Sequence, residues 1–125
     1  VHKVTLTSAQ ANKVVTVTID NVAQKGAIKI VKQDKDSKKR LTGAEFQWKD
    51  IVTGKTGIVT VGIDGTITIP NLSVNRTYEI TETKAPTGYV LDKTVHKVTL
   101  TTAQANKTVT VTVDNVAQKG AIKIV

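Results

Sequence analysis

The chain has 125 residues, a length that suits one domain of moderate size, and its 39% of hydrophobic residues includes only four aromatics. A core must therefore be built mostly from Val and Ile, which favour strands, and the absence of cysteine excludes disulfides, thiol chemistry and cysteine-based metal sites. The net charge of +8 indicates a solvated, lysine-rich surface rather than a nucleic-acid site, because no aromatic side chains are interleaved with the basic residues.

Short runs of alternating apolar and polar residues, separated by Gly, Asp, Asn and Pro, follow one another along the chain, as in a sandwich or barrel. We expect about seven strands, at 27–33, 44–48, 57–61, 66–69, around 78–83, 95–101 and 108–115. Asp64-Gly65 is a favoured pair for a tight turn and is expected to form a hairpin between the third and fourth strands. Pro70 is expected to end the fourth strand, and no segment has the pattern of a helix.

Residues 1–31 recur as residues 95–125, with 28 of 31 positions identical and a period of 94 residues. This period matches a whole domain rather than a solenoid unit, so we expect the chain to be a window of a tandem array. We assign residues 26–119 to one complete domain, residues 1–25 to the terminal strands of a preceding repeat, and residues 120–125 to the first strand of the next. No signal peptide or membrane span is recognisable, so any targeting or anchoring signal is expected outside these residues.

Three predicted strands carry a polar side chain on a face that is otherwise apolar: Lys32 in the first, Glu82 in the fifth and Asn115 in the last. An unpaired buried charge is far costlier than a neutral group, so these side chains must find partners inside the sandwich. We therefore expect the three to meet. Lys29 is the rival lysine and Asp114 the rival acceptor, but alternation places both on the opposite face.

The stretch Glu82-Thr-Lys-Ala-Pro-Thr-Gly-Tyr89, preceded by Lys32-Gln-Asp34 and Leu41-Thr-Gly-Ala-Glu-Phe46, resembles the collagen-adhesin B-type (CnaB) domains of Gram-positive surface adhesins and pilins. The similarity covers residues 26–119. It implies an all-β, antiparallel, transthyretin-like or inverse immunoglobulin-like sandwich that forms an intramolecular isopeptide bond. Carried over by position, the lysine is Lys32, the catalytic acid is Glu82 and the acceptor amide is Asn115.

Burial favours the uncharged forms of an amine and a carboxylic acid, and an uncharged Lys32 is a nucleophile. It would attack the Asn115 amide while a protonated Glu82 polarises the side-chain carbonyl of Asn115 and relays protons to the departing ammonia. This happens once per molecule, so it is self-modification rather than enzymatic catalysis. The alternative is an ordinary buried salt bridge between Lys32 and Glu82, with Asn115 hydrogen-bonded nearby. Such a pair is a poor stabiliser, because removing two charges from water often costs as much as their attraction returns.

These features favour a structural stalk or spacer repeat of an adhesin or fibre, located outside the cell on the cell wall of a Gram-positive bacterium, with adjacent repeats as partners. The competing class is a binding module that contacts a host matrix protein or an anionic polymer through its basic loops. We expect no cofactor, no metal, and neither nucleic acid nor membrane as a partner.

Asn21 occupies the repeat position of Asn115 and is a second candidate acceptor. We expect Asn115 to react within the chain, while residues 1–21 pair with an edge of a neighbouring molecule by strand exchange.

Overall fold

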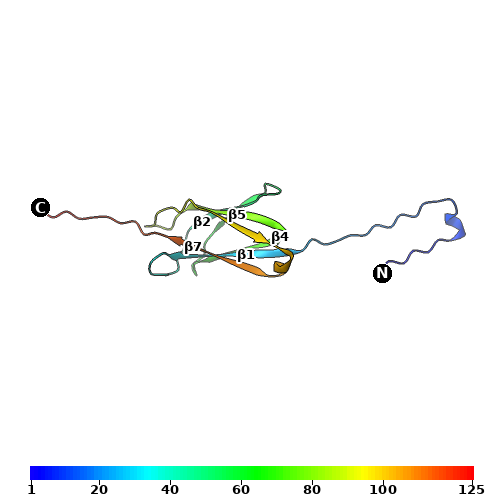
Figure 1. Cartoon of the computed structure of the whole chain (residues 1–125), viewed down its shortest axis with the longest axis horizontal. Helices are drawn as coiled ribbons and strands as arrows, with labels where there is room; N and C mark the ends of the chain where they lie inside the picture. The colour runs from blue at the N-terminus through cyan, green and yellow to red at the C-terminus, as the bar shows by residue number, and fades with distance from the viewer.

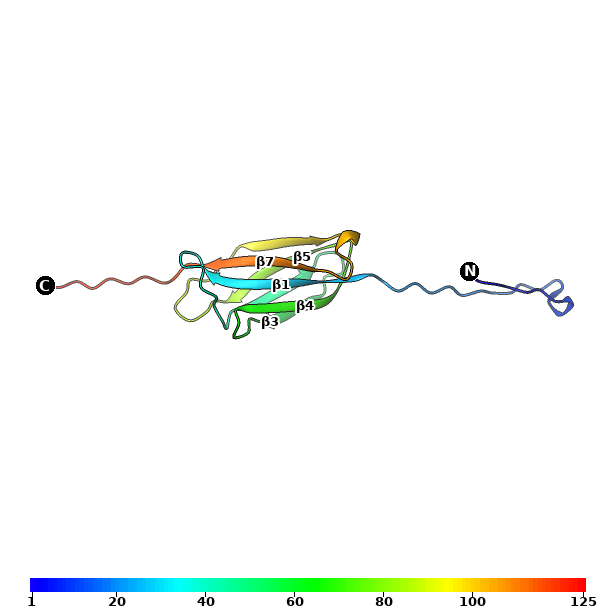
Figure 2. The same ribbon diagram turned by 90° about the horizontal axis from the view of Figure 1, so that it is seen from below.

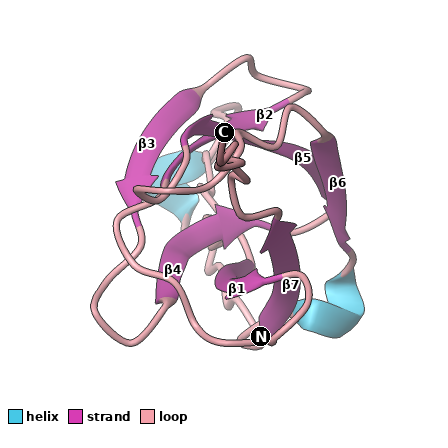
Figure 3. Ribbon diagram, turned by 90° about the vertical axis from the view of Figure 1, so that its left-hand side faces the viewer, coloured by secondary structure: helices cyan, strands magenta, loops and turns pink.

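Seven strands form two facing β-sheets in the computed structural model, which describes residues 1–125. One sheet has the order β4-β1-β7 and the other the order β3-β2-β5-β6, and Figure 3 shows them packed face to face. The strands are β1 (Lys25–Asp34), β2 (Glu45–Asp50), β3 (Thr56–Thr60), β4 (Thr66–Ser73), β5 (Arg76–Lys84), β6 (Val95–Leu100) and β7 (Thr108–Asn115). The expected all-β sandwich of about seven strands is confirmed.

The only helical segments are two 3-10 turns, η1 (Ser8–Gln10) and η2 (Thr102–Gln104). Neither has the length or the apolar character that a membrane-spanning helix requires.

The first and last strands of the domain lie side by side in the same direction. β1 pairs with β7 in parallel, whereas every other strand pair is antiparallel. The register sets Lys32 opposite Val113 and Asp34 opposite Asn115. Figure 2 shows β1 between β4 and β7, with the two ends of the chain leaving the sandwich at opposite ends.

The core between the sheets is made of aliphatic side chains and two aromatic ones, which matches the scarcity of aromatics in the composition. Phe46 is fully buried and Tyr78 is 1% exposed, with the Tyr78 hydroxyl donating to the Ser73 carbonyl at 2.7 Å. Trp48 packs edge-on against Tyr78 at 6.3 Å between ring centroids. The buried cluster contains Ile28, Ile30, Ala44, Phe46, Val61, Ile69, Leu72, Tyr78, Ile80, Val98, Leu100 and Val113.

The turn at Asp64-Gly65 connects the two sheets and is not a hairpin, so that prediction was wrong. The turn itself forms: Gly65 has a φ of +76° and its N–H donates to the Gly62 carbonyl at 3.0 Å. However, β3 pairs with β2 and β4 pairs with β1. An Asp-Gly pair fixes a local reversal of the chain, but it does not decide which strand the next segment joins.

Pro70 lies inside β4 rather than at its end, which corrects the second local prediction. β4 is an edge strand, and its pairing with β1 shifts register between Gly26 and Ile28, so Pro70 sits at an irregularity of the ladder. A proline lacks the N–H that a regular ladder needs, but an edge strand or a bulge does not demand it.

Residues 1–24 contain no strand, and their side chains are almost all exposed. Figure 1 shows this segment extending away from the sandwich, and residues 118–125 extending from the other end.

The ring of Trp48 lies over Gly57, its partner in the pairing of β2 with β3. A Cβ added at Gly57 would stand 2.6 Å from Cε2 and 2.8 Å from Cζ2 of Trp48. We predict that Gly57→Ala displaces the ring and lowers the free energy of unfolding by about 1–3 kcal/mol, measured by urea denaturation with Trp48 fluorescence. The control is Gly62→Ala, where the nearest atom would be 3.4 Å from the added Cβ. Equal stability of the two variants would contradict this packing.

Candidate functional site

Lys32, Glu82 and Asn115 meet between the two sheets, at the end of the sandwich where β1 and β7 finish. Lys32 and Asn115 come from the neighbouring strands β1 and β7, and Glu82 comes from β5 in the facing sheet. The exposed fractions of Lys32, Glu82 and Asn115 are 0%, 3% and 1%. The structure therefore brings together the three residues that strand alternation selected.

The Glu82 carboxyl group lies between the amine and the amide. Its Oε1 is 3.2 Å from Lys32 Nζ. Its Oε2 accepts a hydrogen bond from Asn115 Nδ2 at 3.0 Å. One oxygen thus faces the candidate nucleophile while the other faces the nitrogen that would leave.

This cluster is short of hydrogen bonds. Lys32 Nζ and Glu82 Oε1 are close but lack hydrogen-bond alignment, and both atoms are buried without a hydrogen-bond partner, as is Asn115 Oδ1. A buried polar group left unsatisfied costs roughly 1–3 kcal/mol, and more when it is charged. Three such atoms within one contact cluster make the non-covalent arrangement an expensive one.

Burial also disfavours the charged form of Lys32. Desolvation lowers the pKa of Lys32, against the opposing effect of the Glu82 carboxylate and smaller ones from Asp92 and Asp114. Lys32 Nζ lies 5.7 Å from the centroid of the Phe46 ring, whose face attracts a cation and so opposes part of the effect of burial. Because the pKa of Lys32 is lowered overall, a larger share of the lysine is available as a neutral amine.

The loop between β5 and β6, residues 85–94, holds both the acid and the acceptor with backbone groups. The N–H of Asp92 donates to Glu82 Oε2 at 2.7 Å, and the carbonyl of Val90 accepts from Asn115 Nδ2 at 3.0 Å. The carboxyl group and the amide are therefore oriented by the same short stretch of chain.

Tyr89 fastens this loop to the ends of β1 and β7. Its hydroxyl donates to Asp34 Oδ2 at 2.8 Å, and it forms an antiparallel bridge with Ala117. The next residue, Val90, donates its N–H to the Val116 carbonyl at 2.8 Å. Tyr89, the last residue of the motif that begins at Glu82, thus anchors the loop that orients the Glu82 carboxyl group.

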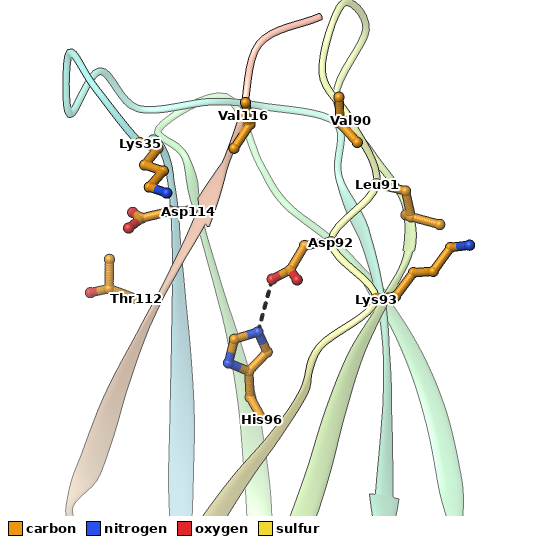
Figure 4. Close-up of a pocket in the computed structure, with 9 residues that line it drawn as sticks. All are labelled: Lys35, Val90, Leu91, Asp92, Lys93, His96, Thr112, Asp114 and Val116. Atoms are coloured by element: carbon orange, nitrogen blue, oxygen red, sulfur yellow. Dashed lines mark hydrogen bonds and ion pairs between the residues drawn. The ribbon is translucent and has the colours of Figure 1, made fainter.

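A cavity of about 530 Å³ opens beside the loop, and none of the three clustered residues lines it. Figure 4 shows Asp92 pointing into it toward His96, with His96 Nε2 3.1 Å from Asp92 Oδ2. Asp92 therefore separates the cavity from the buried cluster, to which it turns its N–H. The cavity is lined by Lys35, Val90, Leu91, Asp92, Lys93, His96, Thr112, Asp114 and Val116. No group of three or more His, Cys, Asp or Glu side chains is placed to hold a metal ion.

The rival residues lie elsewhere. Asp114 is exposed and accepts a hydrogen bond from Gln33 Nε2 at 2.8 Å, on the face of β7 that points away from the core. Lys29 pairs with Thr68 and Thr110 and is absent from the cluster. Asn21 is exposed in the segment outside the sandwich.

Sequence reasoning did not find the parts played by Val90, Asp92 and Tyr89. The first two contribute backbone groups, which leave no trace in the pattern of side chains. Tyr89 belongs to the recognised motif, but alternation cannot assign a contact to a residue in a loop.

Two facing sheets of three and four strands, with the first and last strands paired, define a prealbumin-like β-sandwich. Residues 26–117 match the SpaA family, which is described as a prealbumin-like fold domain. The chain belongs to this family, and the resemblance to CnaB domains is confirmed.

Solved structures of Gram-positive proteins are similar to this chain. The TIE protein of Bacillus anthracis has a TM-score of 0.67 and 29% identity over 75% of this chain and 17% of its own. The pilus 2b backbone protein of group B streptococcus has a TM-score of 0.63 and 34% identity, over 74% of this chain and 41% of its own. The major pilin SpaD of Corynebacterium diphtheriae has a TM-score of 0.67 and 28% identity, over 78% of this chain and 32% of its own. The chain thus spans less than half of each of these proteins. No curated protein sequence matches it.

The link between Tyr89 and Asp34 can be tested by titration. Hydrogen bonds from the N–H of Ser37, from the Tyr89 hydroxyl and from the N–H of Asp36 lower the pKa of Asp34 from 3.8 to about 2. We predict that Tyr89→Phe raises this pKa toward 3.8, as measured by NMR of the carboxyl carbons.

A lowered pKa in the folded state stabilises the fold above the unfolded value, and this contribution is lost as the pH falls through the folded value. The variant should therefore show a weaker dependence of stability on pH between 3.8 and about 2. The control is Asp64, whose lowered pKa comes first from Thr66 and should not move. An unchanged Asp34 titration would show that the loop is not held through this contact.

Proposed function

We propose that residues 26–119 form a structural spacer domain of a fibre or adhesin on the outer surface of a Gram-positive bacterium, closed by an isopeptide bond between Lys32 and Asn115. The observation that carries the proposal is the position of the Glu82 carboxyl group, in contact with both the amine and the amide inside a buried site. Membership of a family whose solved relatives include a pilus backbone protein and major pilins supports the structural role.

The reaction exchanges one amide for another. Lys32 Nζ, as a neutral amine, attacks Cγ of Asn115, and the new Nζ–Cγ bond replaces the Cγ–Nδ2 bond. One Nζ hydrogen stays on the new amide, and the other ends on Nδ2, which leaves as ammonia. No oxidant, metal or cofactor is needed.

Glu82 is suited to carry the proton. Oε1 faces Nζ and can take a proton from it, while Oε2 faces Nδ2 and can deliver one to the leaving group. The N–H of Asp92 fixes the carboxyl orientation. Because the Glu82 carboxyl meets Nδ2 rather than Oδ1, the geometry favours proton relay over polarisation of the carbonyl. The site reacts once and is then consumed, so the domain is not an enzyme.

The bond would join the two strands through which the chain enters and leaves the domain. By analogy with a disulfide that closes a loop of similar length, it should add roughly 4–5 kcal/mol to the free energy of unfolding. It would also transmit tension directly from β1 to β7 and leave residues 33–114 unloaded. Such a domain resists extension, as a spacer in a surface fibre must, and the 94-residue repeat fits such an array.

The competing binding-module function finds less support. Phe46 and Tyr78 are buried, and Trp48 and Tyr89 are half-buried in intramolecular contacts. No aromatic side chain is left exposed for a partner, although such residues usually carry the binding energy of an interface.

The first test is the intact mass of the purified chain. We predict that the wild type is lighter than its sequence mass by one ammonia, and that Lys32→Ala and Glu82→Ala have their full sequence masses. Asn115→Asp should lose one water instead, because an acid acceptor gives the same amide bond. A wild type of unshifted mass would refute the isopeptide bond. Loss of water from the wild type would move the acceptor to an aspartate such as Asp114.

The second test compares stability and extension. Glu82→Gln keeps the size of the side chain but removes the proton relay, so the variant should lack the bond and lose about 4–5 kcal/mol of unfolding free energy. Under tension applied through the termini, it should release residues 33–114, a gain in contour length of about 280 Å. The wild type should show no such step. A wild type that extends like the variant would rule out the mechanical role.

A further inference from the structure

His96 is the only titratable residue on the inner face of β6. It shares this face with Val98 and Leu100, both of which are buried in the core. In the pairing of β6 with β5, His96 lies opposite Ile80, and Glu82 is the next residue along β5 on the same face as Ile80. An imidazole therefore stands where the apolar core ends, beside the strand that carries the acid of the buried cluster.

The side chain of His96 has a single hydrogen-bond partner, the carboxylate of Asp92. Its Nε2 is 3.1 Å from Asp92 Oδ2, a contact that Figure 4 marks inside the cavity. The other oxygen, Oδ1, accepts the N–H of Thr94 at 3.0 Å. The carboxylate of Asp92 is thus held at both oxygens, by a strand on one side and by its own loop on the other.

The backbone of Asp92 reaches the buried cluster. Its N–H donates to Glu82 Oε2 at 2.7 Å, which is the shortest contact that the Glu82 carboxyl group makes. A hydrogen bond to a carboxylate oxygen at this distance fixes the orientation of the group. Oε2 is also the oxygen that faces Asn115 Nδ2, the nitrogen that leaves in the proposed reaction. Two successive contacts therefore connect His96, at the cavity, to the acid.

The second half of the loop between β5 and β6 depends on this connection. Tyr89 and Val90 fasten the first half to the ends of β1 and β7. Residues 91–94 are joined to the rest of the domain by hydrogen bonds of Asp92 alone, one to Glu82 and one to His96. Without His96, the N–H that orients Glu82 would belong to a stretch of loop with no other attachment.

The contact between Asp92 and His96 contributes little to the stability of the fold. The two side chains are 22% and 24% exposed, and ion pairs that water can reach stabilise a domain only weakly. Its effect is therefore expected on the alignment of the cluster rather than on folding.

We infer that His96 is a positioning residue for isopeptide formation: it holds the Asp92 carboxylate, and thereby keeps the Asp92 N–H on Glu82 Oε2. The inference rests on the proposed isopeptide chemistry and adds no step to it, because His96 does not touch the reacting atoms. A small displacement of an aligned group can slow a reaction strongly while the fold is unaffected. Loss of this contact should therefore slow bond formation in a domain that still folds normally.

The experiment follows the reaction in chemically synthesised full-length chains, which are unreacted until they fold. Folding is started by dilution from denaturant and monitored by Trp48 fluorescence, and intact mass at intervals gives the rate of ammonia loss. We expect His96→Leu to lose ammonia roughly tenfold more slowly than the wild type, with unchanged folding. His96→Gln should restore most of the rate, because its amide N–H can donate to Asp92 in place of the imidazole. His96→Ala replaces His96→Leu if the latter does not fold.

The chain supplies a matched control. His2 occupies the repeat position of His96, but it is exposed in the segment outside the sandwich. His2→Leu makes the same change of composition and should leave the rate of ammonia loss unchanged.

A second measurement does not depend on the reaction. Lys32→Met lacks the amine and cannot form the bond, so hydrogen exchange of the Asp92 N–H reports its contact with Glu82 in the unreacted domain. Addition of His96→Leu to this variant should speed the exchange of that N–H at least severalfold. The N–H of Val61, which donates to the Ala44 carbonyl, should exchange as before.

Equal rates of ammonia loss in the wild type and His96→Leu would overturn this inference and leave the proposed function standing. A His96→Gln chain as slow as His96→Leu would overturn it too, because the imidazole would then act through something other than its hydrogen bond. Unchanged exchange of the Asp92 N–H would show that His96 does not hold it in place. A wild type that keeps its ammonia would overturn the proposed function, and this inference with it.

Discussion

The structure depends on the placement of three polar side chains where a sandwich of this size would be expected to hold only apolar ones. Lys32, Glu82 and Asn115 are buried, and three of their polar atoms have no hydrogen-bond partner. A pair of buried charges seldom repays its desolvation, so such a cluster is a poor way to hold two sheets together. The presence of this cluster is explained if it is the precursor of an isopeptide bond. Formation of the amide turns a charged amine into a neutral group and removes the desolvation cost that the folded domain otherwise carries.

The surrounding fold restrains each participant separately. β1 and β7 set the lysine and the amide on neighbouring strands, the facing sheet supplies the acid, and the loop of residues 85–94 orients the acid and the amide through backbone groups. A reaction between two weakly reactive groups gains most from such preorganisation, because little freedom remains to be lost on the way to the transition state. The same loop covers the cluster and leaves the neighbouring cavity outside it, and the resulting burial lowers the pKa of Lys32.

Strand alternation was sufficient to predict the sandwich and to choose Lys32 over Lys29 and Asn115 over Asp114, because a period of two residues assigns every side chain in a strand to a face. Strand alternation could not predict which strands pair with one another. The Asp64-Gly65 pair predicts a turn, yet the strands on either side of it belong to different sheets. Pro70 predicts a strand end, because the sequence does not show that β4 lies at an edge of the assembled sheet. The contributions of Val90 and Asp92 could not be predicted from the sequence either, because a carbonyl and an N–H are present at nearly every position of every sequence.

The parallel alignment of β1 with β7 gives the domain a direction. The chain enters at one end of the sandwich and leaves at the other, so successive domains of the proposed array would add their lengths instead of folding back on one another. β1 alone measures about 30 Å. The length of such an array would be proportional to its number of domains. The number of repeats encoded in the gene would therefore set the distance from the cell surface at which the end of the array is held, in steps of one domain length.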